Sequence, residues 1–204
     1  MKKIKALYLG CIMGASPAAG HELDAEAKNK LNHFINGYIK ENIVNNHEVV
    51  NAVKKANKLR AKWSQYKGIW RTWNDSDASA NQFTYDHSEY LWSQKKDQKF
   101  KDLFVNSSLS HKLKGVQSKS NGKILELFIT DNKGGNVVQS EATSDWYQGD
   151  ESKFRKAANK KEPFYGKIKR DSTVKQSGLH ASVPMWDGDE FIGVAIIFVN
   201  LDSL

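Results

Sequence analysis

A glycine-containing turn, residues 131–135 (DNKGG), is the feature that most constrains the fold of this chain. It separates two apolar, strand-like runs, residues 123–130 and 136–141. Glycine supplies the positive φ that a tight hairpin needs, and the flanking runs supply its two strands. The sequence therefore predicts an antiparallel hairpin that begins a sheet.

The rest of the C-terminal half continues this sheet. A short helix is expected at residues 150–159, because the acidic residues that open it suit the positive end of a helix dipole. The resulting order is β-β-α-β-β-β, an antiparallel plan of the α+β class. Further strands are expected at residues 164–170, 179–186 and 191–201, with turns at 173–178 and 187–190.

The N-terminal half has the pattern of helices. Residues 21–57 carry apolar side chains at spacings of three and four, which predicts an amphipathic helix, and Asn45–Asn46 marks a break in it. Further helices are expected at 95–105, with Phe100, Leu103 and Phe104 on one face, and after an N-cap at Ser107 or Ser108.

Residues 60–90 are rich in aromatic side chains and contain a polar stretch, residues 74–81. Buried aromatics usually serve packing, so we interpret this segment as a folded-over loop pinned by aromatic anchors. In the alternative interpretation, Trp63, Trp70 or Arg71 forms part of the wall of a ligand site.

The first twenty residues have the pattern of a signal peptide. A basic start (Lys2, Lys3, Lys5) precedes an apolar run at 6–15 and small residues at 16–20, which predicts cleavage near Gly20. Residues 21–204 would then form a single domain, with a helical half (21–120) and a sheet half (121–204). Two alternatives are lipidation at Cys11 and an uncleaved anchor, although the apolar run is short for a membrane span.

Charge and cysteine content narrow the function further. The net charge is +8, and cleavage would remove three lysines and leave +5. The lysines are interleaved with acids, as in residues 95–102, and no basic cluster alternates with aromatics, so we expect no nucleic-acid partner.

Cys11 is the only cysteine. An exported domain without disulfides suits a Gram-negative periplasm.

Three blocks of the sequence resemble bacterial PDC (Cache-type, PAS-like) extracytoplasmic sensor domains. The first is VVQSEATSDWYQGDE, residues 137–151, in which the family's aromatic pair is present in swapped order. The second combines residues 171–173 with 181–185, and Arg170 stands where the family has an acid. The third is residues 191–195. The resemblance covers roughly residues 101–204.

This resemblance implies a PAS-like five-stranded antiparallel sheet preceded by a long N-terminal helix and a helical or loop segment. It also implies a ligand between one sheet face and the loop and helix that cross it. Aromatic side chains would wall the ligand, acids would pair with a cation, and Lys175, His180 or Arg170 would pair with a carboxylate. The candidate ligand-binding residues are Trp146, Tyr147, Gln148, Asp150, Phe164, Tyr165, Asp171, Ser172, Lys175, His180 and Ser182.

Several of these residues also have purely structural interpretations. Asp150, like Asp145, would suit a helix N-cap, and Trp146 would suit a core. Ser182 lies on an alternating strand and could face solvent, and His180 could be a structural histidine. Amino-acid-binding relatives carry an Arg before the aromatic pair. Asp145 stands near that place here, which puts an amino-acid ligand in doubt.

The sequence argues against an enzyme. It contains no HExxH metal pattern, no GxSxG nucleophile elbow and no phosphate-binding P-loop. Asp150 and Glu151 are adjacent, which points their side chains apart rather than across a substrate. We therefore expect no catalytic residues, no metal and no cofactor.

The predicted function is a periplasmic sensor domain that binds a small polar molecule, namely an amino acid, an amine or a carboxylate. No output domain follows the last strand, so we expect a separate membrane partner: a histidine kinase, a cyclase or a chemoreceptor. The alternatives are a protein–protein interaction or structural protein with a vestigial pocket, and an unrecognised hydrolase. The long apolar stripe of the first helix predicts a homodimer.

Overall fold

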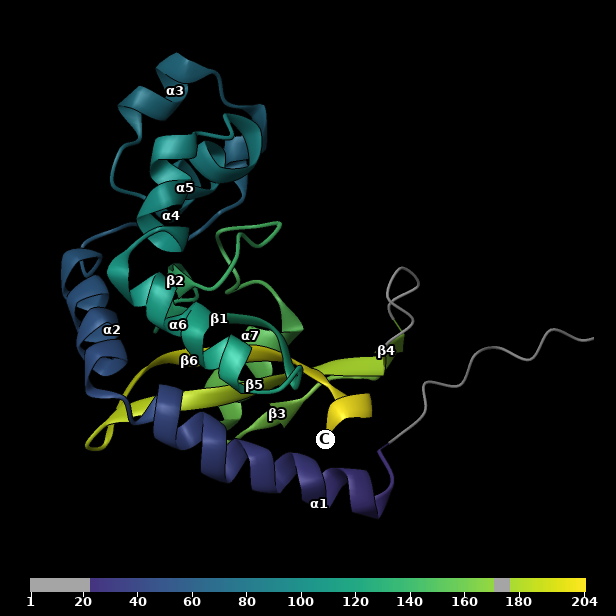
Figure 1. Cartoon of the computed structure of the whole chain (residues 1–204). Helices are drawn as coiled ribbons and strands as arrows, with labels where there is room; N and C mark the ends of the chain where they lie inside the picture. Colours follow the sequence, from purple (N-terminus) through teal and green to yellow (C-terminus); the bar gives the residue numbers. More distant parts are fainter. Residues whose placement is uncertain (1–22, 171–176) are drawn as a thin grey trace, which may run out of the picture.

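An antiparallel sheet lies at the centre of the computed structural model, which describes residues 23–170 and 177–204 (Figure 1). The strand order is β2-β1-β6-β5-β3, and β4 also pairs with β5. The predicted α+β class and PAS-like antiparallel sheet are confirmed. The strands are β1 (Ile124–Asp131), β2 (Asn136–Gln139), β3 (Phe164–Tyr165), β4 (Lys169–Arg170), β5 (Ser177–Asp187) and β6 (Glu190–Asn200).

Two strand predictions need correction. The run predicted at 164–170 forms two short strands, β3 and β4, which both pair with β5. After β3, the N–H of Gly166 still donates to the carbonyl oxygen of His180 in β5, at 2.8 Å. Ser177 and Gly178, predicted in a turn, begin strand β5. Gly178 is required there, because a Cβ would lie 2.8 Å from the ring of Phe198.

The N-terminal helix breaks where the sequence predicts. Helix α1 (Ala25–Phe34) continues into η1 (Ile35–Val44), which has the wider π-helical pattern, and α2 (His47–Leu59) follows. The side chain of Asn46 caps α2 by accepting the N–H groups of Glu48 and Val49 at 3.0 and 3.3 Å.

About half of residues 60–90, the segment predicted as a folded-over loop, is helical. It contains η2 (Ile69–Thr72), α3 (Asp75–Ala80), α4 (Tyr85–Glu89) and η3 (Tyr90–Gln94). Side-chain caps explain the difference, because Asn74 and Asp77 form a reciprocal capping box at α3 and Thr84 caps α4. Of the predicted aromatic anchors, Trp73, Tyr85 and Tyr90 are buried, whereas Phe83 is 71% exposed.

The remaining helices are α5 (Gln98–Val105), α6 (Ser108–Lys119), α7 (Ser152–Lys160) and the short η4 (Leu201–Ser203). Ser107 caps α6, as predicted. Helix α5 begins later than predicted because Asp97 caps it, and Leu103 is 67% exposed instead of sharing the buried face of Phe104. Glu151, and not Asp150, occupies the N-cap position of α7.

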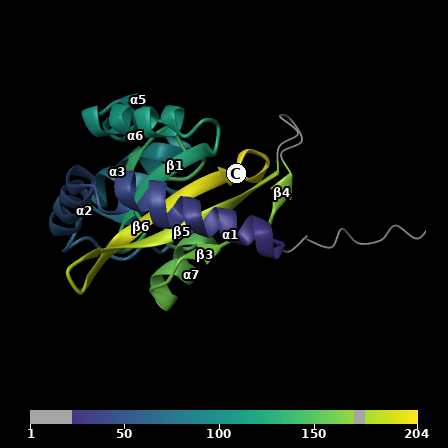
Figure 2. The same cartoon turned by 60° about the horizontal axis from the view of Figure 1, so that its bottom comes forward.

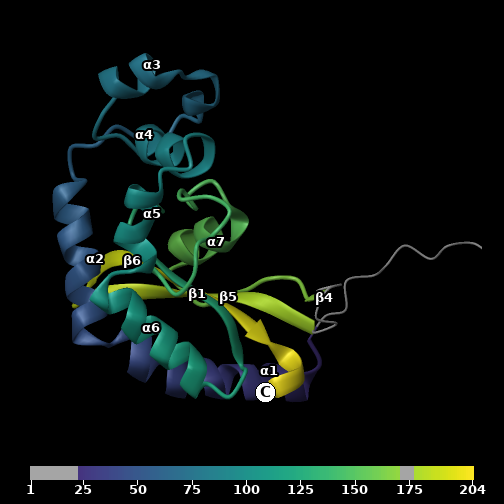
Figure 3. The same cartoon turned by 45° about the horizontal axis from the view of Figure 1, so that its top comes forward.

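Helices cover both faces of the sheet. On one face, α1, α2 and α6 pack on alternate residues such as Leu127, Ala181 and Ile197. On the other face, Phe154 and Ala157 of α7 pack with Phe128, Val194 and Ile196. Figure 2 shows α1 crossing β5 and β6, and Figure 3 shows α1 and α7 on opposite sides of the sheet. In the described ranges, no helix combines the length and apolar character needed to cross a membrane.

Candidate functional site

A cavity of about 250 Å³ lies over the sheet face that α7 covers. We call it the sheet-face cavity. Helix α7 forms one side of it, the β3–β4 edge forms another, and strand β5 contributes His180. Its lining residues are Glu151, Ser152, Lys153, Lys156, Phe164, Gly166, Lys167, Lys169 and His180.

The sheet-face cavity is strongly basic. Four lysines and a histidine line it, and Glu151 is the one acid among the described lining residues. The ammonium of Lys153 lies 3.4 Å from Glu151 and 5.3 Å from the ring centre of Phe128. That of Lys156 lies 4.8 Å from the ring centre of Phe164. Two of the lysine ammonium groups thus lie close to aromatic rings. The excess of positive charge in the cavity favours the binding of an anion.

Strand β5 supplies two of the predicted residues to this side of the sheet. The imidazole of His180 lies 3.5 Å from Glu126 and 4.9 Å from the ring of Phe198. Ser182 pairs with Phe164 across the strands, is fully buried, and finds no hydrogen-bond partner for its hydroxyl among the described residues. The solvent-facing alternative for Ser182 is therefore wrong.

Two other predicted residues line a second cavity of about 170 Å³, here called the loop cavity. It is enclosed by Tyr147, Asp150, Tyr66, Arg71, Glu89, Asp145 and Glu151. The rings of Tyr66 and Tyr147 are stacked with centres 4.1 Å apart. Burial raises the pKa of Tyr147 to about 12 and raises the pKa of Asp150 above its ordinary value. Arg71, the alternative wall residue, does line this cavity.

Glu89 is the residue of the loop cavity that the sequence did not indicate. Its carboxylate is almost fully buried and accepts the N–H of Tyr147 at 2.6 Å and the hydroxyl of Ser93. Burial raises the pKa of Glu89 to about 7, although both hydrogen bonds oppose the shift. No sequence pattern distinguishes Glu89 from other acids that begin or end short helices.

Trp146 lies in the core instead of on a ligand. Its indole is fully buried and packs against Trp63, Tyr85, Phe100 and Phe104. The guanidinium carbon of Arg60 lies 4.9 Å from its ring centre. Trp146 therefore does not form the wall of a ligand site, as predicted, but belongs to the core, which was the alternative. The reason is that helices α4 and α5 fold over the loop and enclose its ring.

Gln148 and Tyr165 also have structural positions. Gln148 is buried, and its amide donates to the carbonyl oxygen of Asp145 at 2.7 Å, which closes the loop on itself. Tyr165 follows Phe164 on a strand and so points to the opposite face, where its hydroxyl donates to Asn32 of α1 at 2.7 Å. Asp171, Ser172 and Lys175 lie outside the described residues.

None of the four lysines that line the sheet-face cavity is among the ligand-binding residues predicted from the sequence, although their spacing indicates that they share a face. Lys153 and Lys156 are three apart on a helix and Lys167 and Lys169 are two apart beside a strand, so each pair shares a face.

Within residues 23–170 and 177–204, no three His, Cys, Asp or Glu side chains converge to hold a metal ion.

Comparison with known proteins finds distant similarity to solved sensor domains. No family model matches the sequence, and no curated protein matches it. The sensory domain of the Campylobacter jejuni chemoreceptor Tlp3 matches with 15% identity and a TM-score of 0.37, over 74% of this chain and 61% of that one. The extracellular domain of the putative histidine kinase vpHK1S-Z8 matches with 13% identity and a TM-score of 0.40, over 77% and 62%.

The sensor domain of the V. cholerae histidine kinase DctB matches with 13% identity and a TM-score of 0.33, over 87% and 58%. The chain is thus similar to sensor domains of a chemoreceptor and of histidine kinases. It spans about three fifths of the length of these solved structures. At these identities and TM-scores, the fold and the roles of individual residues rest on the geometry described above.

Proposed function

We propose that the sheet-face cavity binds a small organic anion with a carboxylate group, and that the protein is an extracytoplasmic sensor domain. The observation that carries this proposal is the excess of cations in one cavity, four lysines against Glu151. A carboxylate would accept hydrogen bonds from Lys156 and Lys169, while Phe164 would pack against the carbon skeleton. The amine and amino-acid alternatives for the ligand are less well supported by this charge.

The ligand signal would pass through α7 to the loop that precedes it. The N–H of Gln148 donates to the carbonyl oxygen of Gly134 at 2.8 Å, and a Cβ at Gly134 would collide with the backbone of Gly149. The loop that precedes α7 is thus in direct contact with the β1–β2 turn. A ligand that binds lysines of α7 would favour one position of this helix and loop, and so shift the population of conformations.

Export with cleavage near Gly20, and readout by a membrane histidine kinase, cyclase or chemoreceptor, remain parts of this proposal. A homodimer through the N-terminal helix stays a prediction. The apolar stripe on which it rested packs instead on the protein's own sheet, since Leu31, Ile35 and Ile39 are fully buried there.

Thermal-shift and calorimetric titrations would test the proposed ligand class. We expect succinate or acetate to raise the melting temperature in a concentration-dependent way, and putrescine to have no such effect. Lys156→Gln should weaken the response, and Lys156→Gln with Lys169→Gln should abolish it. Lys160→Gln is the matched control, because Lys160 lies one turn further along α7 and outside the cavity lining. Equal responses in Lys156→Gln and Lys160→Gln would refute the site.

A further inference from the structure

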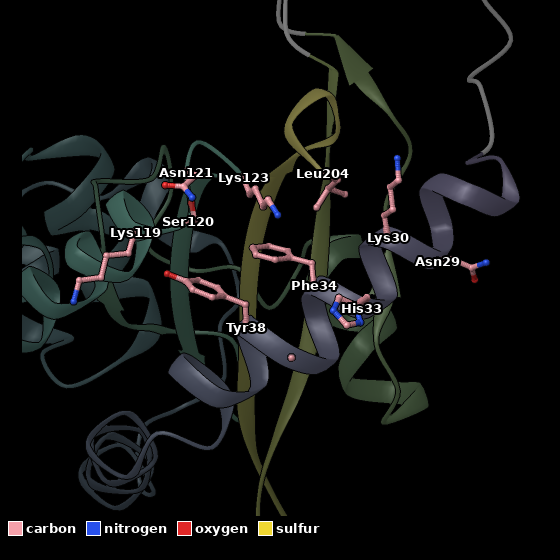
Figure 4. Close-up of a pocket in the computed structure, with 11 residues that line it drawn as sticks. Asn29, Lys30, His33, Phe34, Tyr38, Lys119, Ser120, Asn121, Lys123 and Leu204 are labelled. Atoms are coloured by element: carbon pink, nitrogen blue, oxygen red, sulfur yellow. The ribbon is translucent and has the colours of Figure 1, made fainter.

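A larger groove lies on the opposite side of the sheet, between α1–η1 and the turn that joins α6 to β1 (Figure 4). Its volume is about 620 Å³, within the range of pockets that hold small molecules. We call it the α1–α6 groove. It shares no lining residue with the sheet-face cavity, so it requires an explanation of its own.

Two aromatic rings form a fixed apolar wall of the α1–α6 groove. Phe34 and Tyr38 lie one helical turn apart and stack with ring centres 5.4 Å apart and planes 11° apart. The hydroxyl of Tyr38 donates to the carbonyl oxygen of Val116 in α6 at 2.7 Å. The bond fixes the ring across the two helices, so the wall is ordered before any ligand arrives.

Positive charge borders the same wall. Lys30, Lys119 and Lys123 line the groove, and none of the described lining residues is an Asp or Glu. Lys30 pairs with Glu26 on its own helix at 3.0 Å, whereas Lys119 and Lys123 form no ion pair within the described part of the chain. The ammonium of Lys123 lies 5.6 Å from the ring centre of Phe34. The ammonium of Lys123 therefore lies beside the aromatic wall, whereas the side chain of Lys119 extends away from it (Figure 4).

A glycine keeps the groove open along the helix. Gly37 lies between Phe34 and Tyr38 in sequence and in the middle of the continuous helical stretch 25–44, where glycine is a poor helix former. A Cβ at this position would meet no atom within 4 Å. Packing inside the protein thus does not require glycine here, and a larger side chain would project into free space beside the rings.

We propose that the α1–α6 groove is a binding site for an aromatic carboxylate. The ligand ring would pack against the Phe34–Tyr38 pair, and its carboxylate would bind the ammonium group of Lys123, which lies beside the ring of Phe34. Aromatic contact and charge act together, so an anion without a ring and a ring with a positive charge should both bind poorly. This site is independent of the proposed carboxylate site on the other face.

Isothermal titration with benzoate tests this site in the full chain that carries Lys156→Gln and Lys169→Gln, so that the proposed carboxylate site on the other face does not contribute. Acetate and benzylamine are the comparison ligands. We expect benzoate to bind and the other two to bind at least tenfold more weakly at this groove. Gly37→Leu should reduce benzoate affinity at least tenfold by filling the groove. Gly115→Leu is the matched control, since Gly115 is a helical glycine of α6 whose added Cβ would also meet no atom within 4 Å.

A further variant in the same background separates blocked access from a folding defect. Lys123→Gln should also reduce benzoate affinity at least tenfold, because it removes the cation beside Phe34 and leaves the groove open. The proposal is overturned if benzoate does not bind at millimolar concentration, if benzylamine binds equally well, or if Gly37→Leu and Gly115→Leu bind benzoate alike.

Discussion

The guanidinium of Arg60 lies 2.8 Å from the carboxylate of Asp131, and the two side chains are only 10% and 0% exposed. The hydroxyl of Tyr85 donates to the same carboxylate oxygen, also at 2.8 Å. The other oxygen accepts the N–H groups of Lys133 and Gly135, each at 2.9 Å. One buried carboxylate thus joins the end of α2, helix α4 and the β1–β2 turn.

Removing Arg60 should destabilise the protein strongly. In Arg60→Ala, Asp131 keeps its hydrogen bonds from Tyr85, Lys133 and Gly135 but loses the bond from Arg60 and with it its counter-charge inside the protein. Such a loss typically costs about 3–5 kcal/mol of unfolding free energy. Arg60→Lys should recover little of it, because a single ammonium cannot also reach the carbonyl oxygens of Gly135 and Asn136 that Arg60 contacts at 3.3 and 3.0 Å. Urea denaturation measures both effects.

A surface ion pair provides the control for this experiment. Lys54 pairs with Asp187, and both side chains are partly exposed, at 47% and 38%. Lys54→Ala should therefore change the unfolding free energy by less than about 1 kcal/mol. A similar loss in Lys54→Ala and Arg60→Ala would contradict a special role for the buried pair.

Glu89 should make the stability fall as the pH rises. Burial raises its pKa to about 7 in the folded protein, from an ordinary value of 4.5. Between these values the folded state holds a proton that the unfolded state releases, so the stabilisation is complete below about pH 4.5 and lost by about pH 7. The shift corresponds to about 3 kcal/mol across this window.

Glu89→Gln isolates this effect, because the amide does not titrate and its oxygen can still accept the N–H of Tyr147. The stability difference between wild type and Glu89→Gln, measured by urea denaturation at intervals from pH 4 to pH 8, should slope through the window. A difference independent of pH would mean that Glu89 titrates near its ordinary pKa.

Two buried tryptophans should differ in their tolerance of phenylalanine. Trp92 donates its indole N–H to the carbonyl oxygen of Thr143 at 2.9 Å, whereas that of Trp146 finds no partner among the described residues. Both rings are fully buried, so both substitutions lose packing. Trp92→Phe should cost about 1–3 kcal/mol more than Trp146→Phe, because it also leaves a buried carbonyl unsatisfied. Equal losses by thermal or urea unfolding would contradict this difference.

The sequence was sufficient to predict the sheet because strands and turns are local. Glycines in the 131–135 turn and the apolar runs on either side specify a hairpin without knowledge of the rest of the chain. Alternation also places Phe164 and Tyr165 on opposite faces. It does not say which helix covers which face, so Tyr165 was assigned to the ligand although it contacts α1.

The candidate site was harder to predict because its residues come from distant segments. Glu89 meets Tyr147 only after the helical segment folds over the loop, and the same movement encloses Trp146. A residue's chemistry cannot reveal such a contact. The capping box of Asn74 and Asp77, in contrast, was visible in the sequence and would have predicted α3 in place of a loop.

Helix α5 provides a test of how far periodicity alone can be used. Phe100, Leu103 and Phe104 have the spacing of one helix face, yet Phe104 is 6% exposed and Leu103 is 67% exposed. The core lies under Phe100 and Phe104, whose rings contact Trp146 with centres 6.3 and 5.9 Å away. Leu103→Glu should therefore change the unfolding free energy by no more than about 0.5 kcal/mol. Phe104→Ala should cost about 3–5 kcal/mol through the cavity that it leaves. A large loss in Leu103→Glu, measured by the same urea denaturation, would mean that Leu103 is covered in solution, by a second copy of the chain or by a partner.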